Sequence, residues 1–511
     1  MSDNSIYSQV ILSKTGLEIP VFKSGKTVDS RYDPERESQR LIEQIKHDSH
    51  FLIVTGIASG ILIKTILKDR PQTFILAVEN SQDDIDYLKG LKIVNELSND
   101  KRVCFTTVDS LKDKITELYV PAFYGNLQVI EQRGWTLENT GLIETINKSI
   151  NIAIGIVSAD FSVQSHFGKL WQHNILNNIK HLDKSQNIGN LPVEKTALIV
   201  AAGPTLDKTI QTIKNELSKY FIIATDTALS ILNSYGIIPQ AVISIDGQNV
   251  SNIHFIHNTK SEFSQTFFLF DLCANSSAVN MVLKNSNKVC LFTSGHPLSE
   301  YLNRHFSLGL PSLFSGAGTV TISAVDFAIK AGFKNIKIAG ADFSYSNGKP
   351  YAKGTYLDRL YNQKSNKINP AQKQFSALEF RTPLIAKNDT FTTQILDAYR
   401  TSFEIFLNNT GCTFIKENDL YVISNNQNKQ YDFNIIGQNK INGEQILKEL
   451  QNVFNSKKSS PVFNSIFDLS ESDISLLPLI SWLRNHDNKD RSDFSYFYDK
   501  ALMIYRGLGG N

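Results

Sequence analysis

Two tyrosines and a carboxylate at the end of an apolar strand are the residues of this chain whose types and spacing best suit chemistry. The strand NIKIAGAD ends on Asp342, and the loop after it carries Tyr345 and Tyr351 on either side of an Asn-Gly turn. Phenol hydroxyls on such a loop can donate hydrogen bonds to a departing phosphate. The segment therefore predicts catalytic tyrosines and a nucleotide-binding Asp342, with simple packing of the loop by the rings as the alternative.

A glycine turn earlier in the chain, Gly203-Pro204-Thr205, connects an apolar strand to an amphipathic helix. Glycine lets a ligand approach the backbone, and proline suits the first turn of a helix. The amides that follow point out of the helix start and, with the helix dipole, favour a phosphate. The turn predicts a nucleotide-binding site, with ordinary helix capping by Thr205 as an equally good explanation.

A second glycine turn and two strand-end carboxylates complete the predicted nucleotide-binding residues. Ser315, Gly316 and Gly318 lie in a turn that opens another helix, where tight packing of helix on sheet is the alternative. Asp226 and Asp246 each follow an apolar strand. A carboxylate at that place can accept hydrogen bonds from a ribose or a base, or it can cap the next helix.

All these candidates lie in a region where apolar strands alternate with helices, between about residues 190 and 425. Such alternation predicts a parallel sheet with right-handed crossovers. Ligands of these sheets bind at the carboxyl ends of the strands, which is where the candidate residues fall. We therefore expect an α/β protein whose central domain, residues 190–425, is Rossmann-like and carries the active centre.

The N-terminal region, residues 1–185, is predicted to form a smaller, degenerate Rossmann-like domain. An apolar strand runs through Gly56 and Gly60 into a helix, and the next strand ends on Glu79, which is the order of a nucleotide-binding unit. The third glycine of that fingerprint is missing, so a retained scaffold is favoured over a working cofactor site. A further strand is expected at residues 151–162, before a long helix.

The end of the chain is predicted to be mostly helical. A helix is expected from about residue 389 to 407, followed by two short strands. Residues 430–511 then show helical spacing of apolar side chains and are expected to form a small appended domain. A polar bridge with Gly, Asn and Pro at residues 183–195 marks the predicted boundary between the first two domains.

Composition excludes several classes of function. The net charge is +2, from 52 basic and 50 acidic side chains, and gives no drive toward nucleic acid or anionic membranes. The four cysteines are scattered, which predicts buried thiols rather than disulfides or a zinc site. With no signal peptide and no bilayer-length apolar stretch recognised, a cytoplasmic location without a membrane span is expected. No D-x-D pair ends a strand, so a metal-bridged donor is disfavoured.

The chain resembles the motility-associated factor proteins, which glycosylate flagellin and contain a 6-hydroxymethylpterin diphosphokinase (MptE)-like domain. The strings that carry this resemblance lie at residues 30–41, 159–179, 198–207, 226–248 and 314–352. Each string is weak alone, and together they are specific. The resemblance runs over most of the chain.

The central domain is also similar to bacterial sialyltransferases that use a CMP-linked donor. Those enzymes have a Gly-Pro-Ser turn where this chain has Gly203-Pro204-Thr205, and two tyrosines around an Asn-Gly turn where it has Tyr345 and Tyr351. The resemblance implies an inverting transfer of a sialic-acid-like nonulosonic acid from CMP to Ser or Thr of flagellin. It implies no further cofactor and no metal.

One departure from the sialyltransferase pattern concerns the catalytic base. The stretch where those enzymes carry a catalytic histidine contains none here, and Asp389 is the predicted substitute. An ordinary Asp has a pKa of about 3.9 and is a poor base unless burial raises that value. His296 and His305 are alternatives from other loops.

Two other functions stay open. Relatives with this domain suggest an ATP-dependent hydroxymethylpterin diphosphokinase, which would need carboxylates such as Asp226, Asp246 and Asp342 to hold Mg²⁺. The missing histidine and the incomplete N-terminal glycine pattern instead suit a flagellin-binding protein that has lost its catalytic residues. Metal dependence of nucleotide binding separates the first alternative from the transferase, and loss of all nucleotide binding indicates the second.

Overall fold

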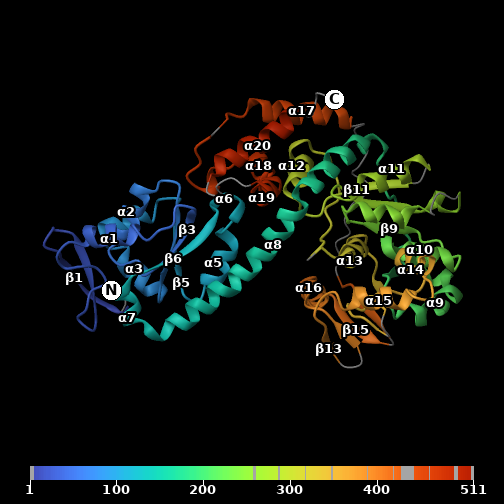
Figure 1. The fold of residues 1–511 in the computed structure, drawn as a ribbon, viewed down its shortest axis with the longest axis horizontal. Coiled ribbons are helices and arrows are strands. Elements are labelled where there is room, and N and C mark those ends of the chain that lie inside the picture. Colours follow the sequence, from blue (N-terminus) through green and yellow to red (C-terminus); the bar gives the residue numbers. More distant parts are fainter. Residues whose placement is uncertain are drawn as a thin grey trace. The chain divides into compact units, whose positions relative to one another are not determined.

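The computed structural model describes residues 5–256, 261–285, 288–316, 318–346, 349–387, 390–417, 419–426, 442–459, 461–487 and 493–507. The chain folds into two units, Met1–Lys169 with Gln451–Asn511, and Leu170–Leu450 (Figure 1). We call them the N-terminal unit and the central unit. The last helices belong to the N-terminal unit because they pack against its helix α6 (Pro121–Tyr124), whereas the sequence set them apart as a domain of their own at residues 430–511.

The N-terminal unit contains a parallel sheet of four strands in the order β5-β4-β3-β6. These strands are β3 (Ser49–Thr55), β4 (Phe74–Glu79), β5 (Val103–Thr107) and β6 (Asn126–Glu131), and a separate hairpin joins β1 (Tyr7–Leu12) to β2 (Glu18–Phe22). The helices before and between them are α1 (Pro34–Ile42), α2 (Ile61–Asp69), α3 (Gln82–Leu88), α4 (Lys92–Leu97), α5 (Leu111–Leu118), α6 (Pro121–Tyr124) and α7 (Arg133–Glu138). The predicted order of strand, glycine turn, helix and strand is confirmed.

The strand expected at residues 151–162 is wrong, because this segment lies inside one long helix, α8 (Ile143–Asn178). Its buried side chains, Ile146, Ile150, Ala153 and Val157, recur every three or four residues and so lie on one helical face. The apolar residues between them misled the prediction. Ile152 and Ile156 are 45% and 49% exposed, so the apolar run is not a strand buried on both sides.

The C-terminal helices confirm the predicted helical end of the chain. They are α17 (Gly443–Ser456), α18 (Glu471–Ile474), α19 (Leu477–His486) and α20 (Phe494–Arg506). In the N-terminal unit α19 and α20 pack against α6. The ring centroid of Phe494 lies 4.6 Å from that of Phe123, and Arg484 Nε donates to the Ala122 carbonyl at 2.8 Å. Aromatic packing and a buried guanidinium therefore join the two ends of the chain in this unit.

The central unit is built on one sheet of eight strands in the order β11-β10-β9-β8-β7-β12-β16-β15. The strands are β7 (Thr196–Val200), β8 (Tyr220–Thr225), β9 (Ala241–Ser244), β10 (Phe267–Asp271), β11 (Lys288–Phe292), β12 (Asn335–Ala339), β15 (Thr413–Glu417) and β16 (Leu420–Ser424). The first six are mutually parallel, and β16 and β15 extend the sheet in antiparallel pairing. All eight strands were predicted from apolar runs, and the parallel α/β fold is confirmed.

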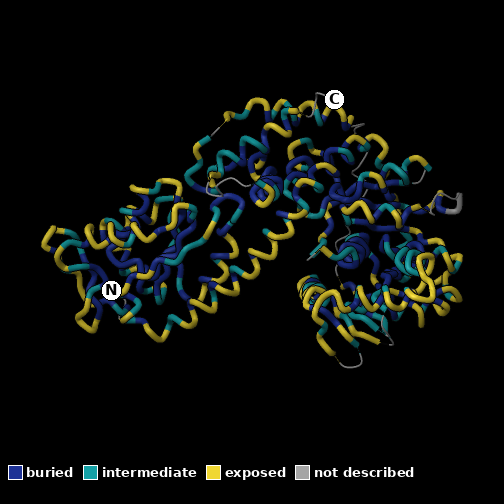
Figure 2. The backbone as a smooth tube through the Cα atoms, viewed as in Figure 1, coloured by how far each residue is buried: buried dark blue, intermediate teal, exposed yellow. Residues whose placement is uncertain are grey.

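The helices of the central unit connect and cover this sheet. They are α9 (Leu206–Asn215), α10 (Asp226–Ser234), α11 (Ser276–Lys284), α12 (Pro297–His305), α13 (Val320–Lys330), α14 (Tyr356–Gln363), α15 (Ala371–Glu379) and α16 (Gln394–Asn409). Helix α13 packs against β7, β8 and β9, and every residue from Thr321 to Ile329 is buried. The strands β3, β4 and β7 to β11 are likewise buried along most of their length, whereas β5, β6 and β15 are largely intermediate or exposed (Figure 2).

The helix expected from about residue 389 begins later than predicted. Residues Thr390–Thr392 form strand β14, which pairs antiparallel with β13 (Ile385–Lys387), and α16 starts at Gln394. The β-branched sequence Thr-Phe-Thr favours the strand. Thr393 caps the helix, because its hydroxyl accepts a hydrogen bond from the Leu396 amide at 3.2 Å.

The strand order reverses between β7 and β12. The chain moves from β7 outward to β11 and then returns to place β12 on the other side of β7. In open α/β sheets, ligands bind outside the carboxyl ends of the strands at such a point of reversal. A ligand site is therefore expected at the loops after β7 and β12.

Candidate functional site

The loops after β7 and β12 approach each other closely because glycines stand on both sides. The Gly203 amide donates to the Gly340 carbonyl at 2.7 Å. A Cβ on Gly203 would lie 2.5 Å from Asp342 Oδ2, and one on Gly340 would collide with the Ala201 carbonyl oxygen. Gly340 also has φ +72°, a value that other residues rarely adopt. These glycines allow close packing of two backbones.

The predicted phosphate position at the start of α9 already holds a protein carboxylate. The Thr205 amide donates to Asp342 Oδ2 at 2.7 Å, and the Thr205 hydroxyl donates to Asp342 Oδ1. Pro204, the residue before Thr205, is buried. Burial raises the pKa of Asp342, and the hydrogen bonds from Thr205 act in the opposite direction. Asp342 thus caps α9 and occupies the place that an anion would take.

The loop that carries Tyr351 is held from several sides. The Ala352 amide donates to the Ala202 carbonyl at 2.9 Å, and the Lys353 amide donates to Asp207 Oδ1 at 2.9 Å. The Gly354 carbonyl accepts a hydrogen bond from the Ser230 hydroxyl at 3.0 Å. The backbone on the C-terminal side of Tyr351 is therefore fixed to α9 and α10.

The loop that carries Tyr345 is held by a short antiparallel pairing. The Tyr345 amide donates to the Phe391 carbonyl at 2.6 Å, and the Phe391 amide donates back at 3.2 Å. Ser346 and Lys349, which lie between the two predicted tyrosines, exchange backbone hydrogen bonds at 3.2 and 3.0 Å, and the Asn-Gly pair expected between them lies outside the described residues. Strand β14 thus positions Tyr345 beside the carboxyl edge of the sheet.

Tyr345, Tyr356 and Tyr399 all act electrostatically on Tyr351, and we call these four tyrosines the tyrosine cluster. Within the described residues none of their hydroxyls has a hydrogen-bond partner, and none is sealed from solvent. Buried phenol hydroxyls ordinarily find a partner, so four open donors indicate room for a ligand.

Tyr351 is partly exposed and is surrounded by other titratable groups. Its side chain is 37% exposed, yet burial raises its pKa to about 12, with Tyr356, Tyr345, Asp226 and Tyr399 adding to the shift. At neutral pH the Tyr351 hydroxyl keeps its proton and can donate a hydrogen bond to a ligand.

Tyr356 and Tyr399 were not predicted from the sequence. Tyr356 begins α14, and its ring meets the ring of His254 edge-on at 5.0 Å between centroids. Tyr399 lies on α16, far away in the sequence. For each of these tyrosines burial raises the pKa first, and Asp246 adds to the shift. Tyr399 lies inside a helix, far from any turn or strand end, and Tyr356 follows the Gly354 turn without standing at a strand end, so the strand-end pattern pointed to neither.

The two strand-end carboxylates lie beside this cluster. Asp226 is buried at the start of α10, where Oδ1 accepts from the Thr227 amide at 2.6 Å and Oδ2 accepts from the Ser244 hydroxyl at 2.7 Å. Asp246 is half-buried, and its Oδ1 accepts from the Gln248 amide at 2.9 Å. Asp226 is thus fixed by internal partners, whereas Asp246 keeps more freedom to accept from a ligand.

The second glycine turn keeps open space at its tip. Gly316 has φ +55°, and a Cβ there would meet Ile322 Cδ1 at 2.6 Å and the Ser402 hydroxyl at 3.0 Å. Gly318 has φ +88°, and a Cβ added there would have no neighbouring atom within 4 Å. The amides of Gly318 and Thr319 both donate to the Ser315 carbonyl. The turn therefore packs against α16 on one side and faces open space on the other.

The structure describes two of the three candidate bases, His296 and His305. Asp389 lies outside the described residues. His296 caps α12, with Nδ1 accepting from the Leu298 amide at 3.2 Å, and burial lowers its pKa to about 3. His305 ends α12 and stacks on Tyr301 at 5.0 Å between centroids. Neither histidine is placed with the tyrosine cluster by any of these contacts.

Another carboxylate, Glu379, lies near Tyr345 and was not predicted. It is the last residue of α15 and is 4% exposed. After burial, Glu379 is the cause that raises the pKa of Tyr345. Its helical spacing of four from Phe375, a buried aromatic residue, is the one signal in the sequence that could have drawn attention to it.

The glycine turn of the N-terminal unit is filled by protein side chains. A Cβ on Gly56 would lie 2.6 Å from Trp135 Cγ, so the indole covers the turn. Glu79 is fully buried; it accepts from the Trp135 indole N–H, from the Ile57 amide at 2.9 Å and from the Tyr7 hydroxyl at 3.2 Å. Burial raises the pKa of Glu79 to about 7. Core side chains thus occupy the position that a ribose takes in a Rossmann site.

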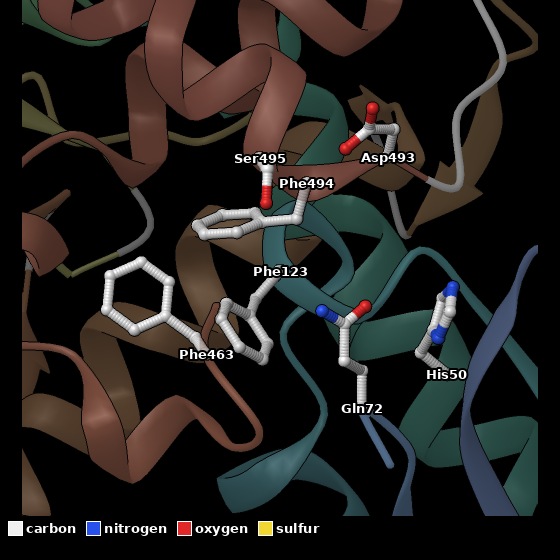
Figure 3. A pocket seen from close by; sticks show the side chains of 7 residues that line it. All are labelled: His50, Gln72, Phe123, Phe463, Asp493, Phe494 and Ser495. Carbon is white, nitrogen blue, oxygen red and sulfur yellow. The ribbon is translucent and has the colours of Figure 1, made fainter. Parts of the chain in front are cut away.

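The N-terminal unit also contains a small pocket. Its lining residues are His50, Gln72, Phe123, Phe463, Asp493, Phe494 and Ser495 (Figure 3). The rings of Phe123, Phe463 and Phe494 gather on one side of it, and Gln72 and His50 lie on the other (Figure 3). Its volume of about 40 Å³ holds a water or two and no nucleotide. We therefore place the candidate site at the tyrosine cluster.

The described ranges contain neither a cluster of metal-type side chains nor a helix able to span a membrane. Nowhere in these ranges do three or more His, Cys, Asp or Glu side chains gather in an arrangement suited to a metal ion. Among the helices that the structure describes, none has the length and apolar character required to cross a membrane.

Comparison with known proteins identifies relatives of the central unit and of the whole fold. Residues 173–348 match the family model described as 6-hydroxymethylpterin diphosphokinase MptE-like. An uncharacterised protein of Treponema pallidum is 37% identical over 202 residues, which are 38% of this chain and 71% of that protein. A second one is 35% identical over 146 residues, covering 28% of this chain and 70% of its own length.

A solved structure matches nearly the whole chain. It is the MAf glycosyltransferase from Magnetospirillum magneticum AMB-1, with a TM-score of 0.56 and 13% sequence identity over 98% of this chain and 87% of that one. At that identity the match establishes the fold. The family match of residues 173–348 and the 37% identical relative show that this chain belongs to the MptE-like family, and the solved structure shows that it has the fold of the MAf glycosyltransferase.

Proposed function

We propose that this protein is a glycosyltransferase that moves a sialic-acid-like nonulosonic acid from a CMP donor to Ser or Thr of flagellin. The observation that carries the proposal is the tyrosine cluster, whose four hydroxyls have no partner within the described residues and lie where the strand order reverses. The fold shared with a MAf glycosyltransferase supports the reaction class. The choice of CMP and of flagellin rests on the resemblance of residues 198–207 and 314–352 to the families named above.

In the proposed reaction, Tyr345 and Tyr351 stabilise the phosphate that leaves with CMP. The bond between the sugar and the phosphate breaks with inversion, and negative charge grows on the phosphate oxygens. Burial raises the pKa values of both tyrosines, so each phenol stays protonated and can donate to that charge. A monophosphate carries less charge than a diphosphate, and two neutral donors are a suitable partner for it without a metal ion.

The other predicted residues surround the CMP moiety in this proposal. Asp246 and Asp226 would accept from ribose or base groups, and the turn at Ser315–Gly318 would contact the nucleotide on its open side. The turn at Gly203–Thr205 acts as a wall, because Asp342 already occupies the anion position of α9. Asp389 remains the base proposed from the sequence.

Calorimetric titration of CMP and of ATP, each with Mg²⁺ and with EDTA, tests the proposal. Metal-independent binding of CMP that weakens when Tyr345 and Tyr351 are changed to Phe is the expected result. ATP binding that requires Mg²⁺, with no binding of CMP, would replace the transferase by a diphosphokinase.

The diphosphokinase stays a second candidate because of the family description that residues 173–348 match. Its reaction would transfer a diphosphate from ATP to a hydroxymethylpterin. Asp226, Asp246 and Asp342 would have to hold Mg²⁺, and two of them already bond to Thr205, Thr227 and Ser244. A flagellin-binding role without catalysis is the third candidate, and it predicts binding of neither nucleotide.

A further inference from the structure

The last turns of helix α8 belong to the central unit and carry Trp171, Asn174 and Asn178. These residues follow each other at spacings of three and four, which places them on one side of the helix. Both asparagines are buried, with 1% and 0% of the residue exposed. Burial of a side-chain amide costs free energy unless hydrogen bonds satisfy it, so the partners of these amides indicate what the helix face does.

Asn174 joins the loops that follow β9 and β10. Its Nδ2 donates to the Gly247 carbonyl and to the Cys273 carbonyl, at 3.0 Å each. Its Oδ1 accepts from the Ser276 amide at 3.3 Å. Two acceptors and one donor therefore face this side chain, and a side-chain amide can satisfy all three, whereas a carboxylate or an apolar group of the same shape cannot. The surroundings of Asn174 thus require an amide.

The loop after β9 packs tightly against this helix face. A Cβ on Gly247 would lie 3.1 Å from Asn174 Nδ2 and 3.2 Å from Trp171 Cδ1. The residue before Gly247 is Asp246, whose backbone carbonyl accepts from the Asn275 amide at 3.0 Å. The backbone at these two positions is therefore fixed by two hydrogen bonds, one from Asn275 and one from Asn174.

The side chain of Asp246 is less constrained than its backbone. The residue is half-buried, and its Oδ1 accepts from the Gln248 amide at 2.9 Å. A polar group on a fixed backbone binds a ligand with a smaller loss of conformational entropy than one on a loose loop. The hydrogen bonds that hold the loop thus prepare the Asp246 carboxylate to accept from a ligand.

We propose that Asn174 is a positioning residue for nucleotide binding that acts through Asp246; this inference rests on the proposed transferase function. The amide of Asn174 fixes the Gly247 carbonyl, and the fixed backbone directs the Asp246 carboxylate toward the ribose or base of CMP. The end of α8 thereby becomes part of the nucleotide site, although Asn174 itself does not contact the nucleotide. The family match, which begins at residue 173, includes this end of the helix.

Asn178 supplies a matched control on the same helix face. Its Nδ2 donates to the Leu272 carbonyl at 3.0 Å and to the Ala274 carbonyl at 2.8 Å, so it also joins the helix to a loop by two hydrogen bonds. That loop follows β10 and carries no residue proposed to bind the nucleotide. A substitution of Asn178 therefore measures what the loss of two such hydrogen bonds does to the fold alone.

The test compares Asn174→Asp with Asn178→Asp by thermal melting and by calorimetric titration of CMP. Aspartate keeps the shape of asparagine but can donate at most one hydrogen bond, and only when it is protonated. We expect both variants to melt at similarly lowered temperatures. Asn174→Asp should weaken CMP binding by about 10-fold or more, the equivalent of one hydrogen bond to a charged group, whereas Asn178→Asp should stay within about 3-fold of the wild type.

Substitution of Asp246 shows whether Asn174 acts through it. Asp246→Asn should itself weaken CMP binding, and Asn174→Asp added to it should weaken binding by no more than about 2-fold further, because the two residues are coupled. In CMP release from CMP-N-acetylneuraminic acid, Asn174→Asp should raise KM and leave kcat within about 3-fold, as expected when ground state and transition state lose the same contact.

Two results would overturn the proposal. Equal weakening of CMP binding by Asn174→Asp and Asn178→Asp would assign Asn174 to the fold alone. A full effect of Asn174→Asp in the Asp246→Asn background would show that Asn174 does not act through Asp246. If Asn174→Asp does not fold, Asn174→Ala against Asn178→Ala makes the same comparison, since alanine removes the hydrogen bonds without adding a carboxylate.

The wild-type protein separates this inference from the function on which it rests. A wild type that binds no CMP defeats the transferase and the positioning role together. A wild type that binds CMP, with Asn174→Asp binding it equally tightly, defeats only the positioning role.

Discussion

The two parallel sheets of this chain carry the same strand, glycine turn and helix, and they differ in what covers the turn. In the N-terminal unit the indole of Trp135 lies on Gly56, and Glu79 has three internal hydrogen-bond partners. In the central unit the corresponding edge carries the tyrosine cluster, whose hydroxyls have no partner within the described ranges. Core side chains fill the edge of the N-terminal sheet, whereas the edge of the central sheet carries hydroxyl donors.

The turns themselves are more alike than their surroundings. Each receives a carboxylate from another segment: Asp29 Oδ2 accepts from the Ser59 amide at 3.1 Å in the N-terminal unit, and Asp342 Oδ2 accepts from the Thr205 amide at 2.7 Å in the central unit. A glycine turn at a helix start is therefore no evidence of a bound phosphate in this protein. The polar groups left without partners distinguish the binding edge from the structural one.

The largest effect is expected from removing both predicted catalytic hydroxyls. Tyr345→Phe with Tyr351→Phe should lower the rate of CMP release from a CMP-linked donor by roughly 10,000-fold, because each donor to a developing negative charge contributes about 100-fold. Steady-state kinetics measure the rate, and thermal melting checks the fold. Tyr361→Phe, whose ring packs on Phe375, is the control. An unchanged rate in the double variant contradicts the assigned role.

The next largest effect is expected at the edge of the N-terminal sheet that Trp135 fills. Trp135→Ala should destabilise the N-terminal unit by about 3–5 kcal/mol, the usual cost of a large-to-small change in a core, and should leave CMP affinity unchanged. Hydrogen exchange of the β3 and β4 amides measures the local stability. Leu137→Ala, at a site 57% exposed on the same helix α7, should have little effect. Loss of nucleotide binding in Trp135→Ala, with the central sheet still protected, would show that the N-terminal edge binds a ligand after all.

A smaller effect follows from the pKa of Glu79. Burial raises this pKa to about 7, above the value of about 4.3 in an unfolded chain. The folded unit therefore holds more protons than the unfolded one between those values, and its stability falls as pH rises from about 4.5 to 7. Asp29, whose pKa burial raises to about 6, acts in the same direction.

Glu79→Gln isolates this contribution. We expect the substitution to remove as much as about 3 kcal/mol of the pH-dependent loss, the equivalent of the shift in pKa, while the share of Asp29 persists. Denaturant unfolding at pH 5 and pH 8 measures it. Asp86→Asn, at an exposed position on α3, is the comparison. A slope that Glu79→Gln leaves unaltered would show that Glu79 titrates normally.

The smallest effects are expected at the two tyrosines that the sequence did not reveal. Tyr356→Phe and Tyr399→Phe should each weaken CMP binding by about 2- to 10-fold, since a neutral hydrogen bond contributes about 0.5–1.5 kcal/mol. Calorimetry of both variants, with Tyr235→Phe as a control on the same unit, checks this. Equal affinity in both would restrict the ligand-binding part of the cluster to Tyr345 and Tyr351.

The pattern of apolar residues was enough to predict the strands of the sheets. It failed where packing of the whole fold decides between strand and helix. Runs such as TALIV and FIIAT are apolar throughout, which is typical of parallel strands buried on both faces, and each became a strand. The run at residues 151–162 looks similar, yet it is helical, because only Ala153 and Val157 within it face the core. Strand-length apolarity alone does not separate these two cases.

The candidate site, too, could be predicted only in part from local sequence pattern. Tyr345 and Tyr351 stand next to a strand end and a turn, so their neighbourhood was visible in the sequence. Tyr399 and Glu379 reach that neighbourhood through helices α16 and α15, and only the tertiary fold brings them there. The capping of α9 by Asp342 was equally hidden, because its partner Thr205 is distant in the sequence.

A crystal structure of the protein with CMP tests the central claim most directly. The account predicts the nucleotide phosphate within about 2.5–3.0 Å of the Tyr345 and Tyr351 hydroxyls, the ordinary length of an O–H···O hydrogen bond. The Asp342 carboxylate should still cap α9 in that complex. CMP bound at the Gly56 turn with Trp135 displaced, or at the start of α9 with Asp342 displaced and the tyrosines untouched, would contradict it.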